Sequence, residues 1–94
     1  MKLEIDKIYK VQYPVKLSGM TLQDEFIGKY VGIAEDEHES LPCVVCGAQN
    51  HKKGYQFNSY YGKGDLDYET FNIGTNCINK CTFIESTQED MLNH

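Results

Sequence analysis

The sequence predicts a small, mostly β domain, and three observations support that prediction. Short segments with alternating apolar and polar residues recur along the chain, as expected for half-buried strands. Glycine-rich turn signals separate several of these segments. The chain has 94 residues and no apolar run long enough to cross a bilayer, so we expect one soluble domain, residues 1–94.

The first two strands are predicted in the N-terminal third, residues 1–40. In Ile8–Val15 the apolar side chains alternate with Lys10 and Gln12, which indicates a strand with one buried face. Pro14 lacks a backbone donor and therefore predicts a strand end or an edge. A turn or loop is expected over Lys16–Met20.

The second strand is expected over Phe26–Ile33. Gly28 and Gly32 interrupt it, and glycine inside a strand often marks a bulge or a sharp bend. Between the two strands, Thr21 with Asp24 in the third position fits the cap of a single helical turn.

Three more strands are predicted in the C-terminal half. Gly54–Tyr61 and Tyr68–Ile73 flank the turn Gly62–Asp65, and Thr82–Glu85 follows as the last strand. Ser86 and Glu89 have the spacing of a capping box. Residues 87–94 are therefore expected to be a short helical turn or a frayed tail.

The four cysteines form two closely spaced pairs, Cys43 with Cys46 and Cys77 with Cys81. Paired thiolates at such spacings can converge on one cation, so we predict a tetrahedral zinc site with all four as ligands. Two disulfides are disfavoured because the N-terminus has no apolar signal segment. A redox pair would need a βαβ context. His51 is a possible substitute ligand.

The order of elements around these cysteines resembles a zinc ribbon, in which two cysteine knuckles hold a small antiparallel sheet. The resemblance covers residues 41–86 and depends on Cys43–Gly47 and the Cys77–Cys81 knuckle. It implies a zinc-ribbon-like unit with a four-cysteine site. We expect the N-terminal strands to pack on that unit as an antiparallel hairpin or as part of an SH3-like partial barrel.

Composition limits the classes of partner. The formal net charge is −5, and every basic residue is lysine. Arginine is the usual residue for bidentate contact with guanine edges and phosphates, so sequence-specific DNA binding is not expected. We expect a small acidic protein of the cytoplasm with no membrane contact, for which a small-molecule substrate is improbable.

Two enzyme families use parts of the cysteine pattern. Pro42–Cys46 matches the Pro-Cys-x-x-Cys half of the zinc-deaminase signature. The other half, His-x-Glu, is absent, because Glu39 follows His38 directly and the next residue is Ser40. The chain is also faintly similar to HNH nucleases, although only His51 lies between the cysteine pairs, which leaves a degenerate relative as a distant alternative. Zinc closed by four thiolates has no open position, so we expect a protein that is not an enzyme.

The segment between the cysteine pairs contains the expected partner-binding residues. Lysines alternate there with aromatic residues, a combination that suits binding of single-stranded nucleic acid. Two observations count against that function: acidic residues follow at once, and several of the rings are expected in the core. Exposed tyrosine suits protein interfaces, so binding to another protein is favoured over binding to nucleic acid. The acidic loop over Glu35–Glu39 is a further candidate contact for that partner protein. The candidate residues are Tyr55, Tyr60, Tyr61, Lys52, Lys53 and Lys63.

Overall fold

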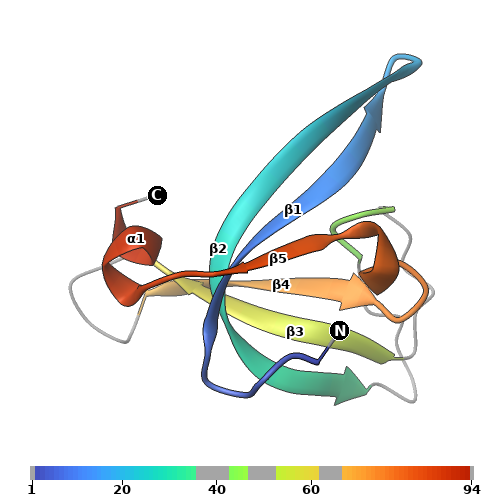
Figure 1. Ribbon diagram of the computed structural model, residues 1–94. Coiled ribbons are helices and arrows are strands. Elements are labelled where there is room, and N and C mark those ends of the chain that lie inside the picture. The colour runs from blue at the N-terminus through green and yellow to red at the C-terminus, as the bar shows by residue number, and fades with distance from the viewer. Residues whose placement is uncertain (1, 36–42, 47–52, 62–66, 94) are drawn as a thin grey trace.

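The computed structural model describes residues 2–35, 43–46, 53–61 and 67–93, and its main feature is one antiparallel sheet of five strands in the order β4-β3-β2-β1-β5 (Figure 1). The prediction of a mostly β fold is confirmed. The elements are β1 (Ile8–Leu17), β2 (Met20–Glu35), β3 (Lys53–Tyr60), β4 (Tyr68–Gly74), the 3₁₀ helix η1 (Ile78–Lys80), β5 (Thr82–Glu85) and α1 (Gln88–Leu92).

The hairpin of β1 and β2 is longer than predicted. β1 continues to Leu17 and β2 begins at Met20, joined by Ser18 and Gly19, whose φ angles are 51° and 80°. Two successive left-handed residues are the arrangement of a type I′ hairpin turn, whose twist matches that of paired strands. The expected loop therefore shrinks to two residues, and the helical turn at Thr21 was wrong because its backbone pairs with β1.

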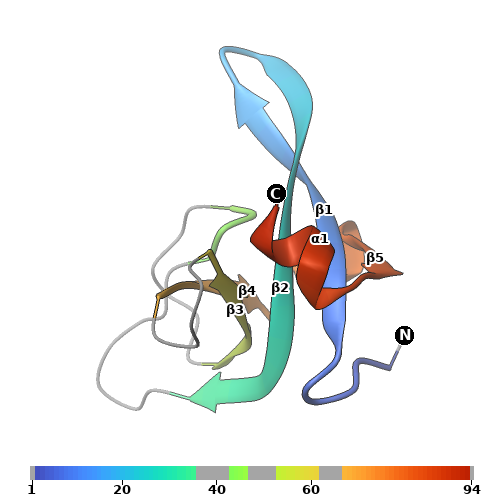
Figure 2. The same cartoon turned by 90° about the vertical axis from the view of Figure 1, so that its left-hand side faces the viewer.

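The far part of this hairpin projects beyond the other strands (Figures 1 and 2). β5 pairs with β1 only from Tyr9 to Gln12, and the pairing of β2 with β3 begins at Lys29. Pro14 thus lies where β1 has no neighbour on the β5 side among the described strands, so the prediction of an edge position is confirmed. We call residues 13–25 the arm.

The two glycines of β2 serve different purposes. The register with β3 shifts between Tyr30 and Gly32, and Gly32 has a φ of 115°, so the bulge predicted there is confirmed. Gly28 instead allows a close approach of strands. A Cβ built on Gly28 would stand 3.2 Å from the Cβ of Phe57 and 3.4 Å from the carbonyl oxygen of Asn58.

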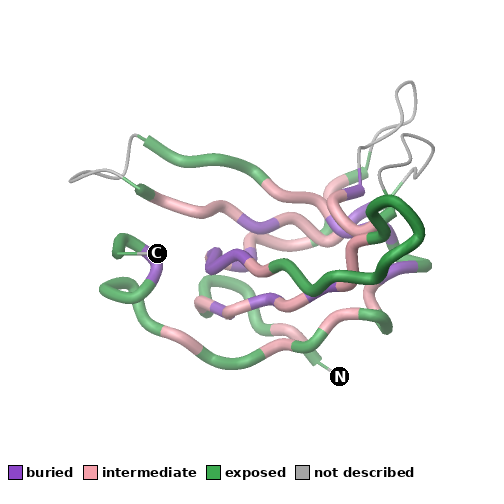
Figure 3. The backbone as a smooth tube through the Cα atoms, turned by 90° about the horizontal axis from the view of Figure 1, so that it is seen from above, coloured by how far each residue is buried: buried purple, intermediate pink, exposed green. Residues whose placement is uncertain are grey.

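The main core lies on one face of the coiled sheet, and its most buried side chains are those of Val11, Phe57 and Ile73. Phe57 of β3 lies 6.1 Å, between ring centroids, from Phe83 of β5. Strands at opposite sides of the sheet are therefore brought together by its curvature, and buried segments gather in the middle of the molecule (Figure 3). Phe26 and Phe71 stack at a centroid distance of 4.4 Å.

A second, smaller apolar contact lies on the other face. α1 packs against β2 and β3, and its buried residue is Met91. Ile27 is buried too, and strand alternation places it opposite to Phe26. The helix starts after Thr87, whose side chain accepts a hydrogen bond from the Asp90 N–H at 3.1 Å. Thr87 is thus the cap, in place of the predicted Ser86.

The close approach at Gly28 gives a test of this packing. Gly28→Ala should destabilise the protein by about 1–3 kcal/mol, because the added methyl group presses on the backbone of β3 and on Phe57. Chemical denaturation measures the change. Gln23→Ala, on the exposed arm, is the control and should change stability by less than about 0.5 kcal/mol. Equal stability of the two variants would contradict the strand packing.

Candidate metal centre

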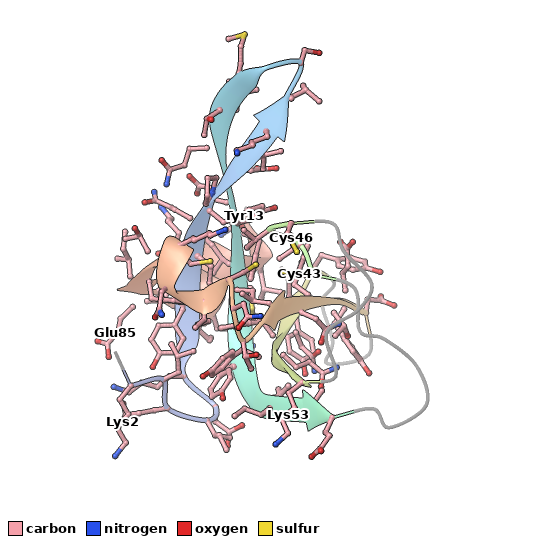
Figure 4. The ribbon with its side chains drawn as sticks, turned by 90° about the vertical axis from the view of Figure 1, so that its right-hand side faces the viewer. Lys2, Tyr13, Cys43, Cys46, Lys53 and Glu85 are labelled. Atoms are coloured by element: carbon pink, nitrogen blue, oxygen red, sulfur yellow. The ribbon has the colours of Figure 1, made fainter. Side chains whose placement is uncertain are left out.

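Three cysteine sulfurs converge at one end of the core. The Sγ atoms of Cys43, Cys46 and Cys77 all lie within 4.8 Å of one another. Thiolates around a tetrahedral zinc stand roughly 3.8 Å apart, since each Zn–S bond is about 2.3 Å. These three side chains are therefore close enough to hold a metal ion after a small contraction. Figure 4 shows Cys43 and Cys46 side by side below Tyr13.

Gly74, the last residue of β4, joins the two cysteine segments. Its N–H donates to the Sγ of Cys43 at 3.2 Å, and its carbonyl accepts from the N–H of Cys77 at 2.9 Å. A second bond, from the Val44 N–H to the Asn72 carbonyl at 2.9 Å, ties the first cysteine segment to β4. The end of β4 thus positions both knuckles, and the sheet determines where the sulfurs meet.

This role of Gly74 was not predicted from the sequence. Gly47, which directly follows Cys46, lies outside the described residues. Gly74 lies three residues before Cys77, the first residue of the second knuckle. It faces Gly54 across the β3–β4 pair. Two glycines facing each other at the ends of paired strands are a signal that could have indicated a close approach by another segment.

The surroundings of Cys43 favour its thiolate. Burial acts to raise the pKa of this thiol, but hydrogen bonds from the backbone N–H groups of Gly74, Cys46 and Val45 outweigh burial, so the pKa is lowered. Backbone donors to sulfur are typical of the outer shell of thiolate metal sites. Cys43 is therefore the sulfur best prepared to bind a cation.

The thiols of Cys77 and Cys81 have raised pKa values. Burial first, and then the neighbouring thiols of Cys46 and Cys43, raise the pKa of Cys77 to about 12. Burial raises the pKa of Cys81 to about 11, with a further contribution from the charge on Cys43. Several thiolates cannot share this space without a compensating positive charge, and a cation at the centre supplies it.

Cys81 is near the cluster but outside it. Its half-buried Sγ lies 3.6 Å from the carbonyl oxygen of Cys77, to which it donates. The single turn of η1 separates these two cysteines, and Cys81 is the residue that ends it. All four cysteines are free of disulfides. The structure thus brings together three of the four predicted ligands and leaves the fourth beside them.

Four of the six predicted partner-binding residues are described, and they lie on both faces and at both ends of β3. Tyr55 packs against the core, whereas Tyr60 lies on the opposite face of β3, next to Tyr68 and Lys29. Tyr61 is exposed after the end of β3, and Lys53 is exposed at its beginning. Lys52 and Lys63 lie outside the described residues, as do His38, His51 and the acidic loop from residue 36 onward.

Comparison with known proteins adds no relative. No family model matches the chain, and neither a curated protein nor a solved structure is similar to it at a significant level. Within the described part of the chain, no helix is long and apolar enough to cross a membrane.

The cluster predicts how the reduced protein binds metal. Zinc or cobalt should bind as a single ion and raise the unfolding temperature, because the ion offsets the charges of converging thiolates. Cys43→Ser and Cys77→Ser should each weaken binding by at least about tenfold. Native mass spectrometry and thermal unfolding measure both effects. Thr75→Ser is the control, and undiminished binding in the cysteine variants would contradict the site.

Proposed function

We propose that this chain is a zinc-stabilised module that binds another protein and has no catalytic activity of its own. The observation that carries the proposal is the arm, whose apolar face is exposed toward its tip. Leu17 and Met20 at its tip are 61% and 63% exposed, and Leu22 is 45% exposed. A contiguous exposed apolar patch on a small domain is typical of an interaction site.

Strand register places these side chains on one face. Along β1, Tyr13 pairs with Asp24 of β2. Val15, two residues further, pairs with Leu22, and Leu17, four residues further, pairs with Met20. Because alternate residues of a strand point to the same side, this face continues the core face of β1 beyond the end of the core. The far face carries polar side chains such as Lys16 and Gln23. The arm is therefore amphipathic, and no described element packs against Leu17 and Met20 at its tip.

Zinc is the metal that we propose for the cysteine cluster, with Cys81 as the fourth ligand. Soft thiolates favour zinc among common cations, and four sulfurs complete its tetrahedral shell. Cys81 is close, since its sulfur contacts the carbonyl of another ligand. Such a closed shell leaves no coordination position for a substrate, which supports a structural role for the ion.

The proposed architecture combines two units. The knuckles lie before β3 and after β4, and this order supports the proposal that the β3–β4 pair with its cysteines is a zinc-ribbon-like unit. The order β4-β3-β2-β1-β5, with a long β2 shared between both halves, suits an SH3-like partial barrel. In this account the metal takes the place of additional core, which a short chain lacks.

The role of Cys81 can be tested with cobalt in place of zinc. Cys81→Ser should reduce the sulfur-to-cobalt charge-transfer absorption by about a quarter, because one of four thiolates is lost. It should also weaken zinc binding about as much as Cys77→Ser does. If Cys81 in the metal-loaded wild-type protein is alkylated as quickly as in the metal-free protein, it is not a ligand.

The arm can be tested with a photo-crosslinking side chain at Met20, and with Glu89 on α1 as the control position. Crosslinking in the native cell should link Met20 to a protein, which is then purified and its affinity measured. Leu17→Ser with Leu22→Ser should weaken that affinity at least about tenfold without changing stability. Crosslinks from Met20 to nucleic acid, or equal yields at Glu89, would contradict the proposal.

A further inference from the structure

A groove runs between the arm and the two cysteine knuckles. It has a volume of about 650 Å³, within the range of pockets that accommodate ligands or peptide side chains. One wall comes from β1 of the arm and the other from the first knuckle and η1. The described lining residues are Pro14, Val15, Lys16, Val44, Val45, Cys46 and Lys80.

The floor and the rim of this groove differ in chemistry. Val15, Val44 and Val45 are half-buried and supply apolar surface from both walls. Lys16 from the arm and Lys80 from η1 are exposed, and the described lining includes no acidic side chain. A basic rim is unusual on a chain with a net charge of −5. Lys16 and Lys80 are the charged side chains among the described lining residues, and at physiological salt charges beyond about 8 Å are largely screened.

The strand edge beside the groove offers little backbone pairing. The carbonyl of Lys7 accepts from the Tyr30 N–H, and the carbonyl of Ile8 accepts from the Ser86 N–H. Alternation therefore directs the backbone of even-numbered β1 residues away from β2. Beyond β5 these are Pro14, which has no N–H, and Lys16. A bound segment would be recognised chiefly by its side chains.

We infer that this groove binds an extended acidic peptide segment of a partner protein, with an apolar side chain against the valines and carboxylates beside Lys16 and Lys80. The inference rests on the proposed protein-binding function and specifies the chemistry of the partner. An apolar floor with a charged rim is the usual anatomy of a peptide site, in which burial provides affinity and charge provides selection.

The metal centre is part of this site. Cys46 lines the groove, and the two valines lie between Cys43 and Cys46. Lys80 lies between the other two cysteines on η1. An ion that links Cys43, Cys46 and Cys77 would fix one whole wall, so binding of metal and binding of peptide should strengthen each other by the same factor.

The test uses a fluorescent synthetic peptide with a central leucine–valine pair flanked by aspartates and glutamates. Anisotropy with the metal-loaded protein should show saturable binding that weakens as salt rises. Lys16→Glu with Lys80→Glu should weaken the binding of this acidic peptide at least about tenfold. The same variant should instead bind more tightly a second peptide in which lysines replace the aspartates and glutamates. Lys2→Glu with Lys29→Glu is the matched control, since neither lysine lines the groove and Lys2 lies at the far end of the molecule from Cys46 (Figure 4).

The other outcomes are equally informative. If the acidic and basic peptides bind alike, or if the control pair has the same effect as Lys16 and Lys80, the groove inference is wrong. Binding of the Met20-crosslinked protein that survives Lys16→Glu with Lys80→Glu would overturn the groove while leaving the arm as the interface. For the link to metal, saturating peptide should tighten zinc binding, and an unchanged zinc affinity would contradict the shared wall.

Discussion

The hydrogen bond from the Gly74 N–H to the Cys43 sulfur is the contact on which the rest of the site depends. It fixes the first knuckle to the end of β4, and the carbonyl of the same residue receives the N–H of Cys77. One residue therefore sets the positions of two sulfurs that are 34 positions apart in the chain, 77 − 43. Because Gly74 is itself buried and paired with Gly54, the convergence of the sulfurs depends on the paired ends of β3 and β4.

The same sheet explains why an apolar surface is exposed on the arm. β2 is long enough to pair with β3 at one end and to form the arm at the other, and the short β5 covers only the inner part of β1. No described element covers the apolar side chains of Leu17, Met20 and Leu22, which continue the core face along the arm. The type I′ turn keeps β1 and β2 paired past the core, and its two flanking residues stay exposed.

Much of the fold could be predicted from local pattern, because alternation and glycine turns are local signals. The positions of β1, β3, β4 and β5 followed from them, as did the bulge at Gly32. The arm was missed because Ser18–Gly19 is a weaker turn signal than Asn–Gly, and polar Thr21 and Asp24 resemble a helix cap. The convergence of Cys43, Cys46 and Cys77 agrees with the spacing. The donor to Cys43 and the groove come from tertiary contacts, which spacing does not encode.

The central claim is that four thiolates close around one zinc ion and thereby build the wall that faces the arm. X-ray absorption of the zinc-loaded protein tests it most directly, since it reports the ligand atoms and their distances. The account predicts four sulfur ligands at about 2.3 Å. A shell with nitrogen or oxygen in place of the Cys81 sulfur, or a protein that takes up no zinc when fully reduced, would contradict it.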